Sequence, residues 1–122
     1  MTAAIDGIEA HLAGLESVWD AGMRDAYAFD RPRTSPAVAL AAAMVESALE
    51  LQELGARAPD PPHLLLGDLC LARASRLLAG TRDQRLPVCF ARAVEHVAAA
   101  AAGGPASPPL RALLDATIEG PG

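Results

Sequence analysis

The chain of 122 residues contains no lysine and no asparagine. These two absences exclude a Schiff-base lysine, a phosphate-loop lysine and an N-linked glycosylation acceptor. No uninterrupted apolar run approaches the roughly 18 residues that a membrane-spanning helix needs. The first residues carry Asp6 and Glu9 where a secretory signal would carry positive charge. We therefore expect a cytoplasmic protein that is not an integral membrane protein.

Metal-ligating and nucleophilic side chains are also few. Two cysteines in a chain without an export signal are most simply free thiols, although a bridge between Cys70 and Cys89 across a helical hairpin is sterically conceivable. His63 precedes Cys70 by seven residues, and Cys89 precedes His96 by the same number. Seven helical residues rise about 10.5 Å, too far for one tetrahedral zinc or for a histidine base beside a thiol. We expect no catalytic residue, metal or other cofactor in this chain.

Charge and composition restrict the fold and the partners. The formal net charge is −5, and the ten arginines are scattered between residues 24 and 111, whereas a nucleic-acid or anionic-membrane surface needs a concentrated basic patch. We expect no nucleic-acid partner. Alanine occurs 28 times and leucine 17 times, against 13 valine, isoleucine and threonine residues together. This balance predicts a single all-α domain, a bundle of about five helices.

The helix boundaries follow from apolar periodicity and from breakers. An apolar stripe at steps of three and four runs from Ile5 to Phe29, and Ser35 followed by Pro36 is a good start for a second helix. Proline- and glycine-rich stretches end the later helices. The predicted helices span about 3–29, 36–56, 61–79, 82–102 and 108–118. Pro87 leaves two possible starts for the fourth helix, residue 82 or a position near Leu86.

The second predicted helix is apolar around most of its circumference, so it is either central or in contact with a partner. Its large apolar residues are Val38, Leu40, Met44, Val45, Leu49 and Leu51. We expect that a small five-helix domain cannot bury all of them. The free chain should then self-associate, or bind a partner over more than about 1,000 Å² of total surface.

Gly67 and Asp68 interrupt the leucines of the third predicted helix. A glycine here predicts close packing on a neighbouring segment. An unpaired buried carboxylate is costly, so Asp68 either faces water or meets a donor on another helix or another chain.

Residues 64–79, Leu-Leu-Leu-Gly-Asp-Leu-Cys-Leu-Ala-Arg-Ala-Ser-Arg-Leu-Leu-Ala, resemble the Gly-Asp helix of polyprenyl diphosphate synthases. Residues 41–46, Ala-Ala-Ala-Met-Val-Glu, are similar to the helix that carries the first aspartate-rich motif of that family. In that register the Asp-Asp-x-x-Asp motif falls on residues 56–60, where only Asp60 remains and Arg57 replaces a carboxylate. The resemblance covers residues 36–80. It implies that Mg²⁺ is held only by a catalytic partner.

The loss of these aspartates is similar to what is seen in the small non-catalytic subunits of heteromeric, hexaprenyl- or heptaprenyl-type diphosphate synthases. The resemblance implies an isoprenyl-synthase-like all-α fragment that forms a heterodimer with a catalytic large subunit. It also implies a role in isoprenoid biosynthesis, in the side chains of quinones such as menaquinone. The interface candidates are Met44, Val45, Leu49, Leu66, Gly67, Asp68, Leu69 and Arg73.

Two other functions stay open at this point. The chain is alternatively a helical adaptor or dimerisation module for an unrelated protein, because helices rich in alanine and leucine are generic. A second alternative is that the chain is a small enzyme or a carrier of an apolar ligand.

Overall fold

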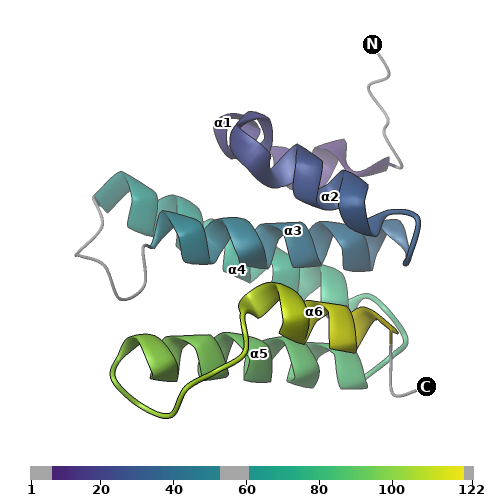
Figure 1. Ribbon diagram of the computed structural model, residues 1–122. Coiled ribbons are helices and arrows are strands. Elements are labelled where there is room, and N and C mark those ends of the chain that lie inside the picture. Colours follow the sequence, from purple (N-terminus) through teal and green to yellow (C-terminus); the bar gives the residue numbers. More distant parts are fainter. Residues whose placement is uncertain (1–6, 53–60, 120–122) are drawn as a thin grey trace.

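The computed structural model describes residues 7–52 and 61–119, and throughout these residues the regular structure is helical, without strands (Figure 1). The predicted all-α bundle is therefore confirmed. The elements are η2 (Glu9–Leu12), α1 (Glu16–Val18), η3 (Trp19–Met23), α2 (Arg24–Asp30), α3 (Pro36–Leu51), α4 (Pro61–Ala79), α5 (Arg85–Ala101) and α6 (Leu110–Glu119). They share one hydrophobic core, to which each of the four long helices α3 to α6 contributes at least one buried residue.

The N-terminal helix begins later than the apolar stripe predicted. Residues 3–6 lie outside the described part, and the short 3₁₀ helix η2 ends before Gly14, whose φ of +83° is left-handed. That conformation ends the first turn, so continuous helix starts only at Glu16 and runs to Asp30. Within it η3 is a π-helical turn, at which Gly22 departs from helical dihedral angles.

Helix α3 begins as the sequence predicted. The Ser35 hydroxyl accepts a hydrogen bond from the Val38 main-chain nitrogen at 3.3 Å, and Pro36 occupies the first turn. Its predicted end at residue 56 lies outside the described residues. Helix α4 has the predicted bounds of 61 and 79.

The sequence predicted that a small domain could not bury all six large apolar residues of α3, and the structure buries four of them, Val38, Leu40, Met44 and Val45. Every residue from Val38 to Val45 is buried, and only Leu49 and Leu51 among the large apolar residues remain partly exposed. Helix α3 passes through the middle of the bundle, in contact with η3, α2, α4 and α6 (Figure 1). The small side chains of residues 41–43 leave room for these neighbours. The apolar circumference of α3 therefore belongs to the core.

Of the two starts that Pro87 left open for α5, the structure has the later one, close to Leu86, and α6 begins two residues later than predicted. Helix α5 begins at Arg85, so Pro87 lies in its first turn, where a missing N–H leaves no intrahelical bond unmade. Helix α6 begins at Leu110, lies beside α5 and also contacts α3 (Figure 1). Its Leu114 side chain is fully buried in the core.

Candidate functional site

Gly67 lies where α4 meets the end of α3. It is buried, and a Cβ atom at this position would lie 2.9 Å from Cγ of Gln52. The Gln52 side-chain amide donates a hydrogen bond to Oδ1 of the exposed Asp68 at 3.2 Å. The close neighbour of Gly67 and the donor to Asp68 are therefore the same residue of this chain.

This arrangement predicts that the effect of Gly67→Ala depends on Gln52. Alanine gains up to about 1 kcal/mol of helix propensity over glycine, but its methyl group displaces the Gln52 side chain and breaks the bond to Asp68. We expect little net change in wild-type background and a gain in stability in a Gln52→Ala background. Urea unfolding of the four variants measures this difference. An equal effect of Gly67→Ala in both backgrounds would contradict the packing described.

The predicted interface residues fall into different environments. Met44 and Val45 are core residues of this chain, and Met44 is fully buried. Leu66 and Leu69 are partly buried against the core, as Leu49 is partly buried on α3.

Arg73 has a contact within the chain. Its Nη1 donates to the main-chain carbonyl of His11 at 2.9 Å and to that of Ala13. Arg73 therefore fastens the N-terminal segment to α4.

A surface cleft opens beside the first turns of α4. Its volume is about 370 Å³, and its walls come from the helix around η3, from the second half of α3 and from α4. The lining residues are Ser17, Val18, Ala21, Gly22, Ser47, Glu50, Leu51, His63 and Leu66. Between the lining residues His63 and Leu66, the side chains of Leu64 and Leu65 are 41% and 70% exposed. We call this hollow the α4 cleft.

A second hollow, of about 260 Å³, lies between α3, α4 and α5. Its lining is almost wholly apolar: Val45, Leu71, Ala74, Ser75, Leu78, Pro87, Phe90, Ala91 and Val94. This second hollow borders the hydrophobic core, because its lining residue Val45 is also a core residue.

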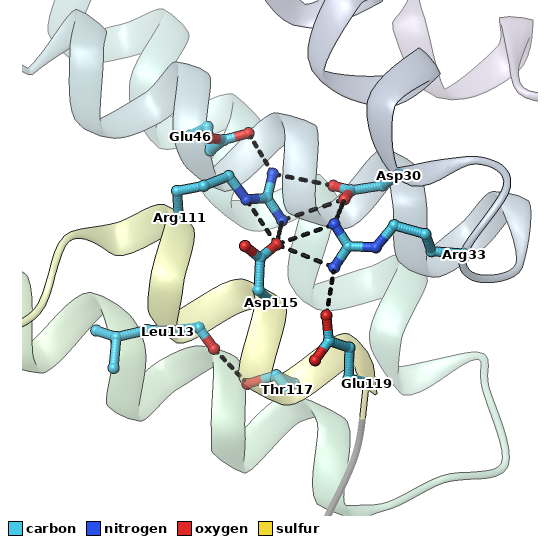
Figure 2. Close-up of polar contacts among 8 residues, drawn as sticks. All are labelled: Asp30, Arg33, Glu46, Arg111, Leu113, Asp115, Thr117 and Glu119. Atoms are coloured by element: carbon cyan, nitrogen blue, oxygen red, sulfur yellow. Dashed lines mark hydrogen bonds and ion pairs between the residues drawn. The ribbon is translucent and has the colours of Figure 1, made fainter.

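Sequence reasoning missed an ion-pair network centred on Arg111 of α6 (Figure 2). The two terminal nitrogens of Arg111 donate to the two carboxylate oxygens of Asp30, each at 3.1 Å, and Nη1 also donates to Glu46 at 3.0 Å. Its Nε donates to Oδ1 of Asp115 at 2.9 Å, and the same oxygen also accepts a hydrogen bond from Arg33. The network thus ties α6 to α2 and α3, and the Asp30 carboxylate within it is completely buried.

Carboxylates outnumber guanidinium groups in this network. Glu119 lies 3.7 Å from Arg33, so Arg33 and Arg111 serve four acids. Burial raises the pKa of Glu46, and the attraction of Arg111 does not offset this because Arg111 is shared with two other carboxylates. The hydrogen bond to Asp115 raises the pKa of Arg33.

The raised pKa of Glu46 predicts a pH-dependent gain from Glu46→Gln. The folded chain holds the Glu46 proton more tightly than the unfolded chain, so the ionised side chain, facing Asp30, Asp115, Glu50 and Arg111, costs stability. That cost is absent below about pH 4.3, the usual glutamate pKa, and is complete above the raised value. Glutamine keeps an oxygen for Arg111. We expect the variant to be more stable than wild type at pH 7 and equal near pH 4 in urea unfolding, whereas a loss at pH 7 would contradict the assignment.

The two cysteines are free, as predicted. Burial raises the pKa of the Cys70 thiol to about 11, which keeps it protonated at neutral pH and unreactive. Among residues 7–52 and 61–119 no group of three or more histidine, cysteine, aspartate or glutamate side chains could hold a metal ion. Residues 56–60, on which the aspartate motif would fall, lie outside the described residues.

Comparison of the chain with protein-family models, with curated proteins and with solved structures found no match. The resemblance of residues 36–80 to polyprenyl diphosphate synthases therefore stays a prediction. In the part of the chain that the structure describes, no helix is both long and apolar enough to cross a membrane.

Proposed function

We propose that this chain is a non-catalytic accessory subunit of a heteromeric long-chain polyprenyl diphosphate synthase in the cytoplasm. The observation that carries the proposal is the position of the two segments that resemble that family. Residues 41–46 lie on α3 and residues 64–79 form most of α4, and these two helices make the most extensive contact in the bundle. Segments that resemble neighbouring helices of a synthase are thus neighbours here.

The described residues do not offer a magnesium site of the synthase type. Asp68, the acid of the Gly-Asp segment, accepts a hydrogen bond from Gln52 and belongs to no cluster of metal ligands. Because Ala56 and Arg57 stand where the aspartate-rich motif of that family has carboxylates, we assign diphosphate and Mg²⁺ binding to the catalytic partner, and to this chain a structural role in activity and product length.

The exposed leucines at the start of α4 are the proposed docking surface. Leu65 is 70% exposed and Leu64 41%, and covering such side chains removes apolar surface from water. They stand at the beginning of the segment that carries the resemblance. Docking there leaves the buried residues of α3 in place, so binding requires no opening of the core.

Co-purification tests this proposal. The chain, with an affinity tag, is co-expressed with a catalytic polyprenyl diphosphate synthase from the same organism, as wild type, Leu65→Asp and the control Val88→Asp. Val88 is also exposed, but it lies on α5. We expect wild type and the Val88 variant to retain the synthase and the Leu65 variant to lose it. Equal retention by all three variants, or by none, would contradict the proposed surface or the proposed partner respectively.

The same leucines favour the second candidate, a helical adaptor for an unrelated partner. That function predicts that the synthase never co-purifies, while another protein does so in a manner that Leu65→Asp abolishes. A homo-oligomer of this chain would not form through residues 38–45 of α3, because these residues are buried in the core.

A further inference from the structure

The α4 cleft has the size and lining of a small-molecule site that the proposed function does not use. Its volume of about 370 Å³ lies within the range of about 300–1,000 Å³ typical of ligand pockets. Three separate segments form it, and the π-helical turn η3 supplies one wall. A Cβ atom at Gly22 would meet nothing within 4 Å, so this wall borders open space.

The lining divides into an apolar part and a polar part. Val18, Leu51 and Leu66 offer apolar surface, whereas the polar side chains are Ser17, Ser47, Glu50 and His63. Ser47 is 6% exposed and lines the cleft. A ligand with both an apolar body and a hydrogen-bonding group would satisfy both parts.

The charged side chains around the cleft determine whether the polar group of the ligand is a cation or an anion. Glu50 lines the cleft and makes no ion pair among the described residues. Arg24, on the same helix as η3, is paired with Asp20 at 2.6 Å and does not line the cleft. Glu50 is also one of the carboxylates that raise the pKa of Glu46, one turn earlier on α3. An anion is therefore disfavoured, and a cation gains an unpaired carboxylate.

We propose that the α4 cleft binds a hydrophobic organic ammonium ion. Its apolar body covers Val18, Leu51 and Leu66, and its ammonium group donates to Glu50 and to the Ser47 hydroxyl. The proposal does not rest on the synthase function, since the substrates of that reaction are anionic diphosphates.

Titration of the full chain with 4-phenylbutylammonium, followed by amide chemical shifts, tests the site, and 4-phenylbutyrate is the matched anion. We expect the ammonium to shift amides at Ser17–Gly22 and Ser47–Leu51 and to bind up to about fivefold tighter than the carboxylate, because one exposed ion pair contributes up to about 1 kcal/mol. Glu50→Gln should abolish this preference. Equal binding of the two probes, or shifts centred on Phe29 or Val88, would overturn the proposal.

A pair of variants locates the site without disturbing the core. Ala21 is exposed and lines the cleft, so Ala21→Phe fills it, whereas Ala28→Phe places the same ring on an exposed position of α2 outside the lining. We expect the first variant to lose ammonium binding and the second to keep it. A native spectrum of each variant, recorded before titration, shows that the fold is intact. Ammonium binding retained by a folded Ala21→Phe variant would contradict the proposed site.

Discussion

Replacing Arg111 with methionine is expected to lower the free energy of unfolding by about 3–5 kcal/mol, the usual cost of leaving a buried charge without its partner. Arg111 holds both oxygens of Asp30, whose carboxylate is completely buried. Arg33 lies 3.4 Å from Asp30 and cannot replace two hydrogen bonds. Domains of this kind have only about 5–15 kcal/mol of total stability. The substitution is therefore expected to leave a substantial unfolded population at moderate temperature.

A double-mutant cycle with Asp30→Asn separates this mechanism from simple loss of packing. Asparagine removes the buried charge, so Arg111→Met should cost at least about 2 kcal/mol less in the Asp30→Asn background than alone. Urea is the suitable denaturant because guanidinium chloride screens the ion pairs. Additive effects of the two substitutions, or a cost of Arg111→Met below about 1 kcal/mol, would show that the network does not hold α6 in place.

Leu40→Ala is expected to cost about 2–5 kcal/mol, the range for deleting a leucine side chain from a core. Leu40 is fully buried on α3, and neighbours on several sides of that helix limit collapse around the cavity. Leu65→Ala is the matched control, because Leu65 is 70% exposed and exposed positions usually change stability by less than about 0.5 kcal/mol. Thermal or urea unfolding measures both. Similar costs at the two positions would contradict the central placement of α3.

Local signals were sufficient to predict much of the fold. Ser35 with Pro36 started α3 as expected, and proline- and glycine-rich stretches bounded α4 correctly. The predicted start of the first helix was wrong because the apolar stripe continues past Gly14, where the backbone is left-handed. Ile8 and Leu15 are buried on either side of that break, so periodicity alone could not reveal it.

The contacts between helices were largely beyond local reasoning. The network joins Asp30 to Arg111, 81 residues away, and no local pattern specifies that pairing. One signal was available, because Arg111 and Asp115 have the spacing of an i,i+4 pair on one helix. The close neighbour expected for Gly67 exists, but it is Gln52 of the same chain.

The proposed accessory function is tested most directly by elongation of an allylic diphosphate with isopentenyl diphosphate and Mg²⁺, using the catalytic synthase alone, this chain alone and the two together. We expect long-chain product only from the mixture, none from this chain alone, and no stimulation by Leu65→Asp. A chain that changed neither the rate nor the product length of the synthase would contradict the proposed function. Turnover by this chain alone that Asp60→Ala abolished would contradict it equally.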